Sequence, residues 1–161
     1  MGTIVEVQLT YPTAREHTMS FFTAIALASF VAAPVSPDPI KQAQESFQGE
    51  WKMVDFISGG EAEGKDLKAD SKITVKDDTM LIRFRGNDTK ANFTLNPKTD
   101  PPTIDFKYQT RNGESLHKGI YKLEEDKLTI CFGLNGADRP TEFKSPEKTR
   151  IAMFILERVK K

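Results

Sequence analysis

The sequence predicts an all-β fold of eight antiparallel strands, preceded by one short helix. Three observations lead to this prediction. Apolar residues recur at every second position in several short runs, the connections between these runs are rich in turn-forming residues, and a helical pattern precedes them. The chain has 161 residues, of which 38% are hydrophobic, so it has the length and apolar content of one ordinary domain.

The helix is expected in the segment "PDPIKQAQESFQGEW", within residues 37–48. Asp38 is a suitable N-terminal cap, and Pro39 fits the first helical position, where the missing N–H is not needed. Gly49 is expected to end the helix.

The strands are predicted by apolar and polar residues that alternate with a period of two. In one of them Met80, Ile82 and Phe84 face one way, whereas Arg83 and Arg85 face the other. Such a pattern is typical of antiparallel strands with one dry and one wet face, which either stack as a sandwich or close into an up-and-down barrel. Closure removes both exposed edges. The expected strands are Trp51–Ser58, Lys72–Lys76, Met80–Arg85, Lys90–Leu95, Thr103–Gln109, Leu116–Leu123, Lys127–Phe132 and Arg150–Val159.

Two connections are longer than the others: "GGEAEGKDLKAD" after the first strand and "GLNGADRPTEFKSPEKT" before the last. Each either covers an end of the barrel or is an ordinary surface loop. In the second, Arg139 and Glu142 flank the stiff Pro140. Arg139 is therefore a candidate either for a structural clamp or for recognition of a polar group of a ligand.

Charge and cysteine content exclude several classes of partner and site. Lysine plus arginine (23) balances aspartate plus glutamate (23), so we expect no nucleic-acid partner and no binding to an anionic membrane surface. The single cysteine, Cys131, excludes an internal disulfide and a zinc site built from cysteines. Cys131 is either a small buried apolar residue or a nucleophile, and its strand-like run lacks the basic setting that activates a thiol.

No residue is assigned to catalysis, and neither a metal site nor a cofactor is expected. His117 is the one histidine in the part expected to fold, and no Gly-x-Ser-x-Gly accompanies it. The carboxylates cluster in turns, where they stay solvated, and the glycine motifs that bind phosphates and dinucleotides are missing. The sequence therefore indicates a protein that is not an enzyme.

The N-terminal part is predicted to direct export. Met19–Pro37 has no charged side chain, and its apolar core Phe21–Ala33 is shorter than the about 20 residues that span a membrane. This length suits a signal peptide, and small residues follow it, as a signal peptidase requires. Residues 1–36 are thus expected to be an extension plus a signal peptide, with translation starting at Met19. An uncleaved anchor is the alternative. We expect no other membrane segment, and a periplasmic or secreted protein.

Four stretches of the chain resemble a known family. "QGEWKMV" is similar to the Gly-x-Trp opening of the first strand in lipocalins and their calycin relatives, and Arg158 in "FILERVKK" matches the basic residue near the end of their last strand. "GIYKLEEDKLTICFGLNGADRPTEF", residues 119–143, resembles a lipocalin-like family of exported domains that is abundant in planctomycete bacteria. With "LNPKTDPPTIDF", the resemblance covers almost all of residues 47–159.

The resemblance implies that residues 49–161 form a lipocalin-like, eight-stranded, up-and-down barrel. Gly49, Trp51 and Arg158 would close its narrow end, with the guanidinium stacked on the indole. The wider superfamily implies a small apolar ligand inside the barrel, as an analogy at the level of the fold. Fatty-acid-binding relatives hold a carboxylate through Arg-x-Tyr in the last strand, and "RIAMFILERVKK" lacks this motif.

We therefore expect an exported barrel that binds a small apolar ligand in its interior or at its mouth. An eight-stranded barrel is wide enough either to be filled by its own side chains or to hold one small ligand. A filled barrel that presents its loops to another envelope protein is the alternative. His117 is either a strand histidine at the mouth or, as in some barrels of the superfamily, a single haem or metal ligand. The candidate ligand-binding residues are Trp51, Phe84, Phe93, Phe106, Tyr108, His117, Tyr121 and Arg139.

Overall fold

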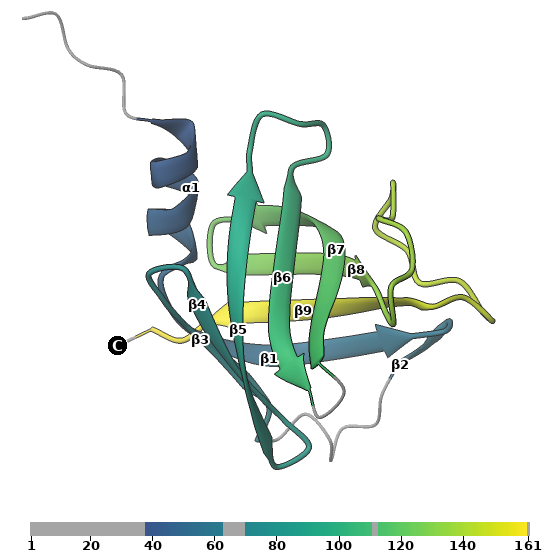
Figure 1. Cartoon of the computed structure of the whole chain (residues 1–161). Coiled ribbons are helices and arrows are strands. Elements are labelled where there is room, and N and C mark those ends of the chain that lie inside the picture. Colours follow the sequence, from purple (N-terminus) through teal and green to yellow (C-terminus); the bar gives the residue numbers. More distant parts are fainter. Residues whose placement is uncertain (1–37, 63–69, 111–112, 161) are drawn as a thin grey trace, which may run out of the picture. The chain divides into compact units, whose positions relative to one another are not determined.

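The computed structural model describes residues 38–62, 70–110 and 113–160. The expected extension and signal peptide, and most of the first long connection, lie outside these residues. One helix, α1 (Pro39–Phe47), precedes the strands (Figure 1). The strands are β1 (Gly49–Ser58), β2 (Glu61–Ala62), β3 (Lys72–Lys76), β4 (Thr79–Phe84), β5 (Asn87–Asn96), β6 (Thr103–Thr110), β7 (Gly113–Glu124), β8 (Lys127–Gly133) and β9 (Ile151–Arg158).

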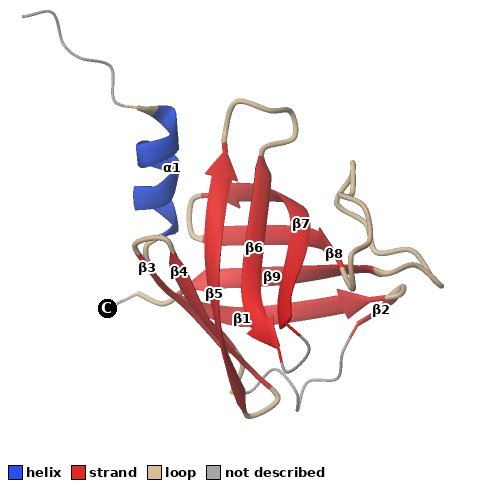
Figure 2. Ribbon diagram, viewed as in Figure 1, coloured by secondary structure: helices blue, strands red, loops and turns tan. Residues whose placement is uncertain are grey.

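The strands form one antiparallel sheet that closes on itself. Consecutive strands from β3 to β9 are neighbours, β1 pairs with β3, and β1 also pairs with β9 (Figure 2). The two-residue strand β2 pairs with the end of β1, so the barrel proper has eight strands. The structure thus confirms the predicted all-β barrel with a short helix before it, and closure rather than stacking removes the edges.

Helix α1 begins where its cap predicts. The Asp38 carboxylate accepts a hydrogen bond of 3.0 Å from the backbone N–H of Ile40, and Pro39 occupies the first turn. The helix ends at Phe47. Gly49 has a φ of +114°, a backbone conformation that residues other than glycine rarely adopt. This conformation turns the chain from the helix directly into β1.

Several strands extend beyond the apolar runs that predicted them. β5 begins at Asn87 rather than at 90, because its pairing with β4 continues through polar residues to the turn Arg85–Gly86. Both turn residues have positive φ values, 52° and 72°, as a two-residue hairpin turn of type I′ requires. Turn geometry, rather than hydrophobicity, therefore sets this end of the hairpin.

The inward side chains form one core with two distinct ends. The closed end lies under α1, near Trp51 in the first part of β1, and the open end lies at the opposite rim, which Phe56 of β1 approaches. Antiparallel pairing sorts the inward residues of every strand in this way; on β7, Tyr121 lies toward the closed end and His117 toward the open end. The two ends have different chemistry.

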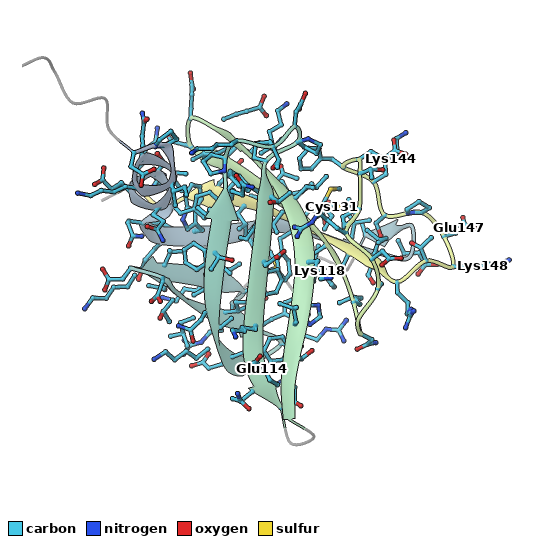
Figure 3. All side chains as sticks on the ribbon, turned by 45° about the horizontal axis from the view of Figure 1, so that its top comes forward. Glu114, Lys118, Cys131, Lys144, Glu147 and Lys148 are labelled. Carbon is cyan, nitrogen blue, oxygen red and sulfur yellow. The ribbon has the colours of Figure 1, made fainter. Side chains whose placement is uncertain are left out.

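The β8–β9 connection, residues 134–150, covers part of the outer wall. Ile120 and Cys131 are cross-strand partners on the outward face, yet they are 1% and 0% exposed. The Cys131 thiol contacts the carbonyl oxygen of Lys144 at 3.5 Å, and Figure 3 shows Cys131 close to the loop that carries Lys144. The part of this connection that carries Lys144 therefore packs on the outer wall and not over an end of the barrel.

Candidate functional site

The open end of the barrel contains an aromatic cup with a volume of about 240 Å³. It is formed where the strands point large rings inward at the rim. The lining residues come from β1, β4, β5, β6, β7, β8, β9 and the start of the β8–β9 loop: Phe56, Ile82, Phe84, Thr89, Phe106, Tyr108, His117, Phe132, Leu134 and Phe154.

Ring contacts run around the cup from β6 to β4. Neighbouring ring centroids are 4.9–5.7 Å apart, within the range for favourable aromatic pairs. β5 contributes Thr89 to the lining instead of a ring. The rings follow one another in the order Tyr108, His117, Phe132, Phe154, Phe56 and Phe84.

The pairing between β5 and β6 ends next to Thr89. β5 pairs with β6 only from Ala91, opposite Tyr108, onward, so the first residues of β5 pair with β4 alone. A surface groove of about 410 Å³ lies at this divergence, and Thr89 and Tyr108 line both the groove and the cup. The groove and the cup therefore adjoin at Thr89 and Tyr108, where the ring of aromatic residues is interrupted.

His117 is held in the cup wall by three polar contacts and two rings. Its Nδ1 lies 2.7 Å from the carbonyl oxygen of Gly133, and its Nε2 lies 3.1 Å from the Tyr108 hydroxyl and 3.3 Å from the Ser115 hydroxyl. The imidazole also stacks on the rings of Tyr108 and Phe106, at 5.3 Å in each case. Because a carbonyl oxygen only accepts, we assign the proton to Nδ1, which leaves Nε2 as the acceptor of the neutral ring.

The lining of the cup is apolar apart from Thr89, Tyr108 and His117. The same lining includes no Lys, Arg, Asp or Glu. Within the described ranges, no group of three or more His, Cys, Asp or Glu side chains is placed to hold a metal ion. Cys131 lies on the outer wall, where burial raises the pKa of its thiol. This thiol is therefore far from the activated state of a nucleophile.

The closed end is built around Trp51 and Arg158. Trp51 is 0% exposed, and its indole N–H donates a hydrogen bond of 2.8 Å to the carbonyl oxygen of Phe47. The Arg158 guanidinium lies 4.1 Å from the indole centroid and donates to the carbonyl oxygens of Ser46 and Gln48 at 2.6 and 2.7 Å. One cation thus stacks on the ring and satisfies carbonyls at the helix C-terminus, where the helix dipole favours positive charge.

The side chain of Phe47, at the end of α1, packs into the closed end of the barrel. This side chain is 0% exposed, lies 6.0 Å from the ring of Phe93 and meets the ring of Tyr121 edge-on at 4.9 Å. Burial raises the pKa of Tyr121, so its phenol stays neutral. The interior beneath α1 is therefore occupied by the protein's own side chains.

Arg139 lies on the outer wall rather than in the cup lining. Its guanidinium pairs with the Asp105 carboxylate at 2.7 Å and donates to the carbonyl oxygens of Gly119 and Ile104. Glu142 pairs with Lys144 at 2.7 Å instead of with Arg139. The contacts of Arg139 thus hold the β8–β9 loop against β6 and β7.

The structure divides the candidate residues predicted from the sequence among three places. Phe84, Phe106, Tyr108 and His117 meet in the cup. Trp51, Phe93 and Tyr121 lie at the closed end, and Arg139 clamps a loop. The other residues that line the cup were not predicted as site residues: Phe56, Ile82, Thr89, Phe132, Leu134 and Phe154.

A signal for some of these residues was available. Ile82 and Phe132 belong to the inward sets that the alternation defines. Phe56 breaks this rule, because alternation from Trp51 and Met53 would point it outward, and a β-bulge between Met53 and Asp55 turns it inward. Phe47 carried a different signal, because a large apolar residue at the end of a polar helix must find a partner surface. The end of the barrel at which each residue lies has no such local signal.

Comparisons with protein-family models, curated proteins and solved structures found no match to this chain. Where the chain is described, no helix has the length and apolar character to cross a membrane.

Proposed function

We propose that this chain is a lipocalin-like binding protein that holds a small apolar ligand in the aromatic cup and catalyses no reaction. The observation that carries the proposal is the cup itself, because ten side chains, mostly aromatic, leave an open, uncharged hollow at one end of the barrel. Concave apolar sites with a few convergent polar groups are typical of small-molecule binding. The closed end supplies the rigid base.

The volume of the cup limits the ligand. An apolar cavity of about 150 Å³ holds benzene. By proportion, the cup's 240 Å³ suits a ligand of about ten non-hydrogen atoms, such as a pair of fused rings. This size, and the absence of Lys and Arg from the lining, argue against a long-chain fatty acid held by its carboxylate.

Filling the cup should abolish binding. Thr89 is the inward residue of β5 that lines the cup, and in Thr89→Phe the added ring is expected to occupy the hollow. Wild-type protein should bind naphthalene saturably, with chemical-shift changes confined to the residues of the cup in two-dimensional NMR. Thr89→Phe should lower the affinity at least tenfold. Thr94→Phe, on the outward face of the same strand, is the matched control and should bind as the wild type does.

Two outcomes would count against the proposal. Shifts scattered over the surface without saturation would contradict a ligand site and favour the alternative of a filled barrel that presents loops to an envelope protein. Equal loss of binding in Thr89→Phe and Thr94→Phe would place the effect outside the cup.

Export is part of the proposal and rests on the uncharged segment Met19–Pro37, which lies outside the described residues. Expression of the full chain in a bacterium should yield a periplasmic or secreted protein that has lost the residues up to the small side chains at Ala32, Ala33 or Ser36. Intact-mass measurement after cell fractionation checks this. Leu27→Arg, which interrupts the apolar core, should leave the uncut protein in the cytoplasm. Recovery of uncut wild-type protein there would contradict export.

A further inference from the structure

We infer that the cup selects an uncharged ring compound bearing a hydroxyl or carbonyl group, and that the Tyr108 hydroxyl, beside His117, recognises this group by hydrogen bonding. The inference rests on the proposed function and adds the chemical class of the ligand. It is carried by the arrangement of the Tyr108 hydroxyl and the His117 imidazole in a mostly apolar lining, with the Ser115 hydroxyl beside the imidazole outside this lining.

More hydroxyls lie beside Nε2 of His117 than this atom can accept hydrogen bonds from. The contact of Nδ1 with the Gly133 carbonyl oxygen fixes the tautomer, so the neutral imidazole offers one lone pair, at Nε2. Two hydroxyls, of Tyr108 and Ser115, lie within 3.3 Å of this lone pair. A single lone pair accepts one well-directed hydrogen bond, so one of the two hydroxyl protons is left to donate elsewhere.

Of the two hydroxyls, the one on Tyr108 belongs to the cup lining. Tyr108 lines the cup and, together with Thr89, the adjoining groove, and its side chain is half-buried. Ser115 is the cross-strand partner of Tyr108 and is not among the lining residues. When the Ser115 hydroxyl donates to Nε2, the Tyr108 hydroxyl is free to donate to a ligand oxygen and to accept from a ligand hydroxyl.

The cup lining offers no charged partner to a charged ligand. A carboxylate or ammonium group in the cup would lose water without gaining a Lys, Arg, Asp or Glu partner, because the lining contains none. Burial of an unpaired charge is strongly unfavourable, whereas a hydroxyl or carbonyl needs only the hydrogen bond that Tyr108 offers. The rings around the cup supply a stacking surface for the remainder of the ligand.

A set of three probes separates these features. Naphthalene has the rings alone, 2-naphthol adds a hydroxyl, and 2-naphthoate adds a carboxylate. The full chain should bind 2-naphthol about three- to tenfold more tightly than naphthalene, the gain expected of one neutral hydrogen bond. It should bind 2-naphthoate more weakly than either. Dissociation constants come from NMR titration or calorimetry.

A variant assigns the hydrogen bond. Tyr108→Phe should abolish the preference for 2-naphthol, so that 2-naphthol and naphthalene bind this variant with equal affinity. Tyr121→Phe removes a phenolic hydroxyl at the closed end, outside the cup lining, and should preserve the preference for 2-naphthol. Circular dichroism checks that both variants fold. If Tyr108→Phe does not fold, the order of the three affinities in wild-type protein still decides the question.

The failure of this inference differs from the failure of the proposed function. Equal affinity for naphthalene and 2-naphthol, or tightest binding of 2-naphthoate, would overturn the inferred ligand class while leaving a cup that binds apolar rings. Retention of the 2-naphthol preference in Tyr108→Phe would overturn the assignment of the hydroxyl. No binding of any probe would overturn both proposals.

Discussion

Trp51→Ala is expected to lower the free energy of unfolding by about 4 kcal/mol, with ligand affinity at the cup unchanged. Replacement of a fully buried aromatic side chain by alanine typically costs about 3–5 kcal/mol. Here the change also removes the hydrogen bond of 2.8 Å to the Phe47 carbonyl oxygen and the surface on which Arg158 stacks at 4.1 Å. Since domains are stable by about 5–15 kcal/mol, this is a large share of the total.

Urea denaturation followed by far-ultraviolet circular dichroism measures this change without relying on the indole. A double-mutant cycle with Arg158→Ala should give a coupling energy of about 1–2 kcal/mol between the two residues. Arg83→Ala is the matched control, because Arg83 forms an exposed ion pair with Asp88 at 2.7 Å, and it should change stability little. Normal stability with loss of naphthalene binding in Trp51→Ala would refute the closure role.

Phe47→Ala is expected to lower the free energy of unfolding by about 3–5 kcal/mol. The substitution leaves a cavity where the Phe47 ring meets Phe93 and Tyr121, and it detaches the apolar end of α1 from the barrel. The loss exceeds that of an ordinary helix position, because the rest of α1 is half-buried or exposed.

The same denaturation experiment on Ile40→Ala provides the control, since Ile40 lies on α1 and is exposed, and a small effect is expected. Naphthalene affinity should be equal in wild-type protein, Phe47→Ala and Ile40→Ala under conditions where all three are folded. A Phe47→Ala protein that binds naphthalene more weakly, at undiminished stability, would show that the closed end belongs to the ligand site.

The barrel could be predicted from the sequence because period-two alternation is a local property. Met80, Ile82 and Phe84 all point inward, as their spacing predicts, and the turns between strands contain the residues that turns require. The first and last strands resemble those of a known barrel family, and this resemblance implied a closed barrel and not two stacked sheets. In the structure Trp51 of β1 pairs with Arg158 of β9, and this pairing belongs to the strand pair that closes the barrel.

The division of the interior into a filled end and a hollow end could not be predicted in the same way. Alternation tells which face a residue occupies, but its position along the barrel axis depends on pairing and on the helix. Phe93 and Phe106 are cross-strand partners, yet Phe47 stacks on Phe93, whereas Phe106 lines the cup. A ligand site assembled from all the inward aromatic residues therefore mixes two places.

The role of Arg139 depends on a long-range contact. Its carboxylate partner, Asp105, is 34 residues away in the chain and belongs to the polar face of β6. A clue exists in the same strands, since Ile120 and Cys131 are apolar at outward positions, where the alternation calls for polar residues. That break in the pattern indicates that another segment covers the wall.

The position of Trp51 determines what its fluorescence reports. It is the single tryptophan of the chain, it is fully buried, and it contacts Phe47 and Arg158 at the end of the barrel opposite the cup. Its emission therefore follows the docking of α1 and the pairing of the first strand with the last. The protein thus contains an intrinsic optical probe of folding that is separate from the site where a ligand would bind.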